Sequence, residues 1–330
     1  MATTTDILPS RSGNGAGGRL SSWKRRLLTG DDIAYLITLA FAVGVVLLGV
    51  LLVLQLWWQS SLAREKFGWQ FLISSVWNPV TEQFGALPFI YGTLVTSAVA
   101  LVVAVPLGLG AAIFLAELAP RALSEVMTFV IELLAAIPSV IIGLLGIFVL
   151  VPVLRIYIGP ALQSVFGFLP IFAGPIYGVG LMAAGLVLAI MIVPFIITVS
   201  REILLAVPAD QREAALALGA TKWESTWKVV VPYARSGIIG SVFLALARAL
   251  GETMAVTMVI GNAPLVSTSL FAPGNTIASV IANEFAEAMG MLNLQALIEL
   301  GLVLFAVTIV INALARLLVL ATTRRGSTHP

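Results

Sequence analysis

Charged residues, cysteine and histidine are scarce in this sequence. Only 10% of the 330 residues are charged, whereas a soluble domain carries roughly 25%. Cysteine is absent, which excludes disulfides, thiolate nucleophiles and cysteine-based metal sites. The only histidine, His329, lies next to the C-terminal residue, so a metal site or histidine-based catalysis would have almost no imidazole to use. We therefore expect no metal, no cofactor and no catalytic residue.

Nucleotide-binding motifs are also missing or out of context. The sequence contains no Gly-Lys dipeptide, so it has no phosphate-binding loop of the G-x-x-x-x-G-K-[ST] type. The segment Gly13-x-Gly15-x-x-Gly18 spells a dinucleotide fingerprint, but no strand precedes it and no helix follows it, as that fold requires. We therefore expect that the chain does not bind ATP by itself and is not an enzyme.

Long apolar runs are what the sequence does contain. Hydrophobic residues make up 59% of the chain and the mean hydropathy is +1.05, which indicates an integral membrane protein. About 20 apolar residues are needed to cross a bilayer as a helix. Six runs meet this length, so we predict an all-α, polytopic fold with six transmembrane helices: Ile33–Trp58, Phe89–Ala116, Val126–Leu154, Pro175–Ser200, Ile238–Ile260 and Gln295–Leu320. The third run contains Glu132 and Pro138, so it is either one kinked helix or a helix followed by a broken segment.

Basic residues set the expected orientation. If the N-terminus is cytoplasmic, fourteen Lys and Arg fall on the inside and three, Arg64, Lys66 and Arg155, on the outside, with Arg248 inside a span. This asymmetry follows the positive-inside rule and places both termini in the cytoplasm. We predict a disordered cytoplasmic tail over 1–30, a transmembrane permease domain over 31–322 and a cytoplasmic tail over 323–330, in a plasma (inner) membrane. A short helix over Thr276–Met289 is expected in the last outer loop.

The cytoplasmic segment at about 201–235 predicts two short helices joined by a turn. Pro208 suits the start of a helix, and Gly219 suits the residue just past a helix end. Thr221 with Glu224 forms the pattern of a capping box that starts a second helix, and Pro232 lies where that helix must end or kink. An amphipathic loop lying on the membrane surface is the alternative.

The same segment resembles the EAA loop of ABC-importer permeases, which docks on a cytoplasmic ATPase. The family pattern is EAA-x3-G-x9-I-x-L-P, and the matching residues are Glu213-Ala214-Ala215, Gly219 and Val229-x-Val231-Pro232. The sequence departs at Val229 and Val231, where the pattern prefers Ile and Leu. The resemblance implies that Glu213, Ala214, Ala215, Gly219 and Pro232 couple the chain to a separate ATPase subunit.

The fifth run contains charges where apolar residues are expected. Arg248 lies about eleven residues into the run, and Glu252 follows it by four residues, on the same face of a continuous helix. The two could form an ion pair that only neutralises itself. Alternatively, Arg248 could bind a tetrahedral oxyanion in passing, because its planar guanidinium presents several donors and stays charged. Glu132 could belong to the substrate path or stabilise helix packing.

This run, Arg248-Ala-Leu-Gly-Glu252-Thr253-Met-Ala-Val, resembles the PstC-type permeases of phosphate ABC importers. Further resemblance is carried by Phe84–Ser97, Glu132–Val140 and Ile281–Phe285. It implies an ABC type I importer permease that moves phosphate inward along a path including Arg248, Glu252 and Thr253. The implied partners are a PstA-like sister permease, two copies of a PstB-like ATPase and a PstS-like phosphate-binding protein. A permease for sulfate or molybdate and an ATP-independent anion carrier are the alternatives. Nucleic acid is not expected as a partner.

Overall fold

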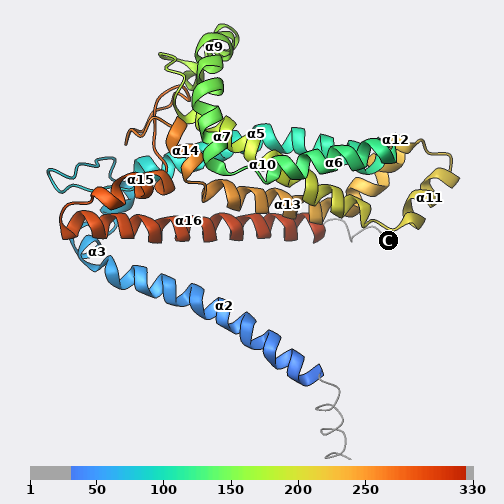
Figure 1. The fold of residues 1–330 in the computed structure, drawn as a ribbon, viewed down its shortest axis with the longest axis horizontal. Helices are drawn as coiled ribbons and strands as arrows, with labels where there is room; N and C mark the ends of the chain where they lie inside the picture. The colour runs from blue at the N-terminus through green and yellow to red at the C-terminus, as the bar shows by residue number, and fades with distance from the viewer. Residues whose placement is uncertain (1–30, 325–330) are drawn as a thin grey trace, which may run out of the picture. The chain divides into compact units, whose positions relative to one another are not determined.

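The computed structural model describes residues 31–324, with side chains over 34–317 (Figure 1). The predicted N-terminal tail, 1–30, lies outside the described residues, as does the predicted C-terminal tail except for Thr323 and Arg324, which end the last helix. The chain divides into two compact units, residues 1–55 and 56–330.

Helices dominate the described residues, and no strand occurs among them. The helices are α2 (Asp31–Gln59), α3 (Ser61–Phe67), α4 (Gln70–Ile73), α5 (Leu87–Ile113), η1 (Phe114–Leu118), α6 (Arg121–Ala135), α7 (Ser139–Leu145), η2 (Gly146–Leu150), α8 (Val151–Val153), η3 (Leu154–Ile158), α9 (Gly159–Phe166), η4 (Pro170–Phe172), α10 (Leu181–Leu205), α11 (Ala209–Ala217), α12 (Lys222–Ser225), η5 (Thr226–Val230), α13 (Val231–Leu250), α14 (Met254–Val259), α15 (Ile277–Glu284), η6 (Phe285–Glu287) and α16 (Met291–Arg324). The predicted all-α fold is confirmed.

Six helical stretches in the described residues are long and apolar enough to cross a membrane, as the sequence predicts. They are Ala34–Gln59, Leu87–Leu118, Ser139–Phe166, Leu181–Leu205, Lys222–Leu250 and Met291–Leu317. Each overlaps one predicted run. The first belongs mostly to the first unit, of which α2 forms the described part.

The third run is divided rather than continuous. The helix α6 stops at Ala135 and a new helix, α7, begins at Ser139. Pro138 causes the break, since it has no amide hydrogen to donate and keeps the preceding residue out of the helical conformation. Of the two alternatives, a helix followed by a broken segment is the correct one. The long apolar stretch starts at Ser139, not at Val126.

The core of the second unit is built on α10, which packs along α5 (Figure 1). Fifteen of its 25 residues are buried. Small residues allow the close approach: a Cβ on Gly185 would lie 2.5 Å from Val99 Cγ1, and one on Gly108 would lie 2.7 Å from Ile196 Cγ2. Such contacts are typical of helices packed in a membrane, where van der Waals contact rather than water exclusion holds them together.

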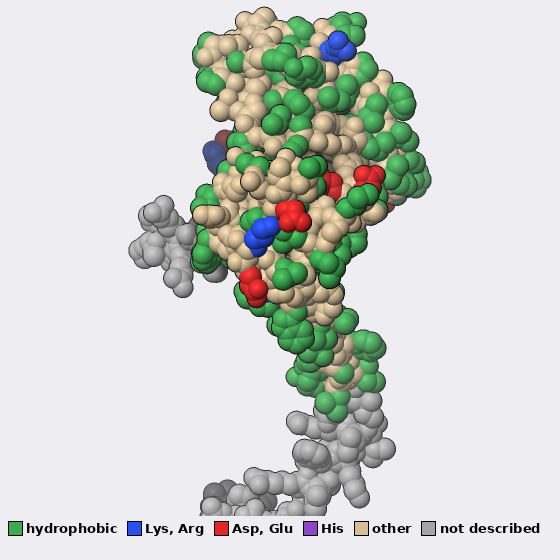
Figure 2. Space-filling view, turned by 90° about the vertical axis from the view of Figure 1, so that its left-hand side faces the viewer, with side chains coloured by type: hydrophobic (Ala, Val, Ile, Leu, Met, Phe, Trp, Pro, Cys, Tyr) green, Lys and Arg blue, Asp and Glu red, His purple; other side chains and the backbone are tan. Residues whose placement is uncertain are grey.

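Two further apolar clusters close the ends of the second unit. One joins α4, α5, α15 and α16 around Phe71, Trp77 and Phe89, and α15 with η6 confirms the short helix predicted over Thr276–Met289. Charged side chains are scattered on the face seen from this side, among apolar side chains and tan atoms that belong to the backbone or to other side chains (Figure 2). The other cluster joins the ends of α5 and α10 to the start of α13 around Ile113, Leu204 and Val230. The helix α11 lies at this second end.

Candidate functional site

The 201–235 segment forms the two predicted short helices. The first, α11, ends in a turn that requires glycine: Gly219 has φ +87°, a conformation that L side chains rarely adopt. The Gly219 amide donates to the carbonyl of Leu216 (2.9 Å), and the Ala220 amide donates to that of Ala215 (3.1 Å). This pair of bonds is the Schellman motif, which satisfies the last carbonyls of a helix.

The second helix, α12, starts with the predicted capping box. Thr221 Oγ1 accepts a hydrogen bond from the Glu224 amide (3.3 Å), and Glu224 Oε2 accepts one from the Thr221 amide (3.0 Å). Both helix ends therefore follow from local sequence, as expected. The connection between α11 and α12 is defined by these local hydrogen bonds.

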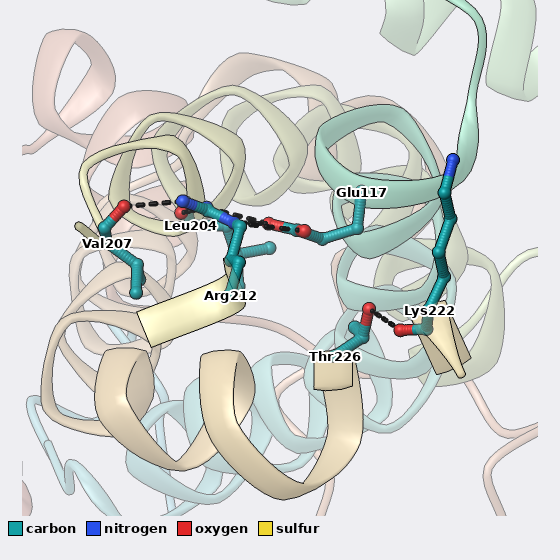
Figure 3. Close-up of polar contacts among 6 residues, drawn as sticks. All are labelled: Glu117, Leu204, Val207, Arg212, Lys222 and Thr226. Atoms are coloured by element: carbon teal, nitrogen blue, oxygen red, sulfur yellow. Dashed lines mark hydrogen bonds and ion pairs between the residues drawn. The ribbon is translucent and has the colours of Figure 1, made fainter. Parts of the chain in front are cut away.

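Pro232 does not end the helix that contains it. The helical segment Lys222–Leu250 runs through this position, because a π-helical turn, η5, precedes it and α13 begins at Val231. A π turn shifts the hydrogen-bond register, which lets the chain pass a residue without an amide hydrogen. At the start of η5, Thr226 Oγ1 donates to the carbonyl of Lys222 (2.8 Å; Figure 3).

Most of the predicted coupling residues lie on one exposed surface. Glu213, Ala214 and Gly219 are exposed and Ala215 is half-buried. Together, α11 and the α12–η5 segment enclose an open hollow of about 480 Å³. Its lining includes Gln211, Ala214, Ala215, Leu218, Gly219 and Val229. The small side chains of α11 leave its backbone accessible from the hollow, which suits a surface that receives another protein.

Arg212, which the sequence analysis did not single out, ties α11 to the rest of the second unit (Figure 3). Its Nη2 lies 2.8 Å from Glu117 Oε1, and its Nε lies 3.2 Å from each carboxylate oxygen. The guanidinium also donates to the carbonyls of Leu204 (2.7 Å) and Val207. Glu117 belongs to η1 at the end of α5, and Leu204 to the end of α10. The only signal in the sequence was its position directly before Glu213, the first residue of the EAA pattern.

The fifth run is broken at its charged residues. The helix α13 ends at Leu250 and α14 begins at Met254, so the predicted continuous run Ile238–Ile260 is wrong. Arg248 lies in the last turn of α13, and its side chain is exposed. Gly251, Glu252 and Thr253 form the link between the two helices.

The ion pair between Arg248 and Glu252, one of the two alternatives for these residues, is not formed. None of the four ion pairs among the described residues includes either side chain. Because the helix stops before Glu252, the two residues are no longer one helical turn apart. Glu252 Oε1 instead accepts a hydrogen bond from the Ala255 amide (3.3 Å) at the start of α14, where a carboxylate also suits the positive end of the helix. Thr253 is half-buried in the same link, and its carbonyl accepts from Thr257 Oγ1 (2.7 Å).

Glu132 does not join this group in sequence or in structure. It lies on α6, three residues before the helix ends, and its side chain is exposed. The helix α6 packs against α10 rather than against α14. The proposed path residues thus fall in two places, the α13–α14 break and the face of α6.

The carboxylate of Glu284, at the end of α15, is held by a residue of the loop before α5. Trp77 Nε1 donates to Glu284 Oε2 (2.8 Å), which links the loop before α5 to α15. Burial raises the pKa of Glu284 above its ordinary value, the Trp77 bond opposes this, and the nearby charge of Glu287 adds to it. Within the described residues, no cluster of His, Cys, Asp or Glu could hold a metal ion.

Known proteins with similar sequences are membrane transport components. The family described as "Binding-protein-dependent transport system inner membrane component" matches residues 104–325. A phosphate transport system permease protein PstC of Mesorhizobium japonicum is 51% identical over 296 residues, covering 88% of this chain and 90% of that protein. The PstC of Xylella fastidiosa strain 9a5c is 48% identical over 299 residues, covering 89% and 92%.

A solved structure shows the same fold. A chain of the MetNI methionine ABC transporter in an inward-facing conformation aligns with a TM-score of 0.52 at 18% identity, covering 71% of this chain and 94% of that chain. At this identity the likeness concerns the arrangement of helices alone. With six membrane-crossing helices, an exposed helical loop of EAA type and these relatives, this chain belongs to the family of binding-protein-dependent transport system inner membrane components.

Proposed function

We propose that this chain is the permease subunit of an ATP-driven importer that carries inorganic phosphate into the cytoplasm. The observation that carries the proposal is the broken fifth span, with an exposed arginine in its last helical turn, in a chain about half identical to phosphate transport permeases. Discontinuous membrane helices commonly form substrate sites, because free helix ends and unpaired side chains meet there.

The chemistry of the break suits an oxyanion. The guanidinium of Arg248 carries a permanent charge and several donors in one plane, which matches phosphate oxygens. Because Arg248 is exposed and has no carboxylate partner among the described residues, its donors are available to an anion. Glu252 and Thr253 border the same break. The negative charge of Glu252 weakens anion binding there, which favours release. Glu132, on the exposed face of α6, is proposed as a separate polar position on the path.

The α11–α12 hollow is proposed as the surface that receives the ATPase. Ala214, Ala215 and Gly219 line its α11 side, and Glu213 is exposed beside them on α11. Pro232 follows the π turn that contributes to the other side. In the proposed assembly this chain pairs with a PstA-like sister permease, two PstB-like ATPase subunits and a PstS-like binding protein. Both chain termini and the hollow then face the cytoplasm, which agrees with the distribution of Lys and Arg.

Import of phosphate requires an energy source in this setting. Moving a doubly charged anion inward against 100 mV, negative inside, costs about 4.6 kcal/mol before any concentration gradient. The given sequence contains no phosphate-binding loop, and we propose that a separate ATPase subunit supplies this energy.

The test is uptake of labelled phosphate, sulfate and molybdate by vesicles that hold the full complex, with and without ATP. We expect ATP-dependent uptake of phosphate and little uptake of the other two anions. Uptake of sulfate or molybdate in preference to phosphate would contradict the substrate, and uptake without ATP would contradict the importer class.

A further inference from the structure

We propose that Arg212 is the residue that transmits movement of the docking helix α11 to the membrane helices, through its contacts with Glu117 and with the end of α10. This inference rests on the proposed coupling function of the α11–α12 hollow. Arg212 would act as a positioning residue, since it holds α11 in place and does not touch the substrate.

The first observation is that α11 has little buried packing against the rest of the second unit. None of its nine residues is buried, so apolar packing does not fix this helix to the second unit. Its own packing is against the neighbouring α12 and η5, which belong to the same hollow. The Arg212 side chain extends from α11 in another direction and bonds to η1 and to the end of α10.

The second observation is the number and placement of the bonds that Arg212 makes. One guanidinium contacts both carboxylate oxygens of Glu117, at 2.8 to 3.2 Å, the carbonyl of Leu204 in the last turn of α10 and the carbonyl of Val207 just after it. Figure 3 shows these partners around the single side chain. Glu117 is 95 residues earlier in the chain, so the contact joins three separate elements. Only 10% of the Glu117 side chain is exposed, which protects the ion pair from screening.

The third observation is where these elements lead. Glu117 follows directly on α5, and Leu204 is the next-to-last residue of α10. These two helices form the packed centre of the second unit. A displacement of α11 that keeps the Arg212 contacts must therefore pull on both central helices at once. A bidentate arginine–carboxylate contact is directional and resists such displacement better than a single point charge.

The test compares substitutions that remove the contact with one that removes a nearby exposed charge. The variants are Glu117→Gln, Arg212→Gln and the double variant, each purified in the full complex with sister permease, ATPase and binding protein. Glu202→Gln is the matched control: Glu202 is at the end of α10, its side chain is 67% exposed, and it pairs only with its neighbour Arg201. The measured quantity is phosphate taken up per ATP hydrolysed, together with the amount of ATPase in each complex.

We expect each single variant to retain the ATPase and to hydrolyse ATP, while phosphate moved per ATP falls about tenfold or more. The double variant should be no worse than the poorer single variant, because both changes remove one shared contact. The control should match the unsubstituted complex. An unchanged ratio in both single variants would overturn the proposal. So would a loss of bound ATPase that accounts for all of the lost uptake, since the contact would then serve only to fold the loop.

The proposed substrate can fail separately. If the unsubstituted complex takes up sulfate or molybdate rather than phosphate, the substrate proposal is wrong. The same ratio measured with that anion then decides whether Arg212 couples the two processes.

Discussion

Replacing Gly219 tests whether the shape of the α11–α12 turn matters for ATPase docking. The space around this residue is open, since a Cβ placed on it would meet no heavy atom within 4 Å. The cost of substitution is therefore conformational: Gly219 has φ +87°, and an L residue in the left-handed region costs about 1–2 kcal/mol. Valine should cost more than alanine because it is β-branched, and asparagine less because it visits this region readily.

The expected effect on docking follows from this cost. No residue of α11 is buried, so little packing energy opposes a change of the turn. A cost of about 1–2 kcal/mol lowers the ratio of molecules with the native turn to molecules without it by a factor of up to roughly 5–30. Because only molecules with the native turn present the hollow, the apparent affinity for the ATPase falls by up to the same factor.

The assay is a titration of the purified ATPase onto the permease pair in nanodiscs, followed by uptake measurements. Affinity should decrease in the order Gly219, Asn, Ala, Val at this position. Gly240→Ala is the control, because Gly240 also has open space but lies within α13 with ordinary helical φ. There alanine should stabilise the helix by up to about 1 kcal/mol. Wild-type ATPase affinity in Gly219→Val would refute the docking role of this turn.

Three further outcomes are expected. Arg248→Leu should assemble normally, because Arg248 is exposed and has no ion-pair partner in the described part of the chain. Phosphate uptake per assembled complex should nevertheless fall at least tenfold, and Arg248→Lys should also be impaired. Near-normal uptake by Arg248→Leu would contradict the anion role. This chain in vesicles alone should move no phosphate, whereas ATP-independent uptake by it would favour a carrier. Since burial raises the pKa of Glu284, its stabilising contribution is present at low pH and is lost as pH rises through the raised pKa. The thermal midpoint of the complex should therefore gain on that of Glu284→Gln as pH falls through the raised pKa of Glu284, and a constant difference across pH would show that Glu284 does not titrate in this way.

The sequence by itself determined the features that depend on neighbouring residues. Six apolar runs of sufficient length gave six membrane-crossing helices, because the bilayer thickness sets the length that such a helix needs. The turn at Gly219 and the capping box at Thr221 were predictable because their hydrogen bonds join residues no more than five positions apart. The break at Pro138 was one of two predicted alternatives, and local proline chemistry accounts for it.

Only the tertiary structure decided the features that depend on distant residues. The helix break after Leu250 separates Arg248 from Glu252, which on a continuous helix would lie one turn apart and could pair. The contact of Arg212 with Glu117 joins residues 95 positions apart, and no periodicity in either segment indicates the other. Such contacts form only where α5, α10 and α11 meet, because packing of whole helices, not local propensity, brings their side chains within hydrogen-bond distance.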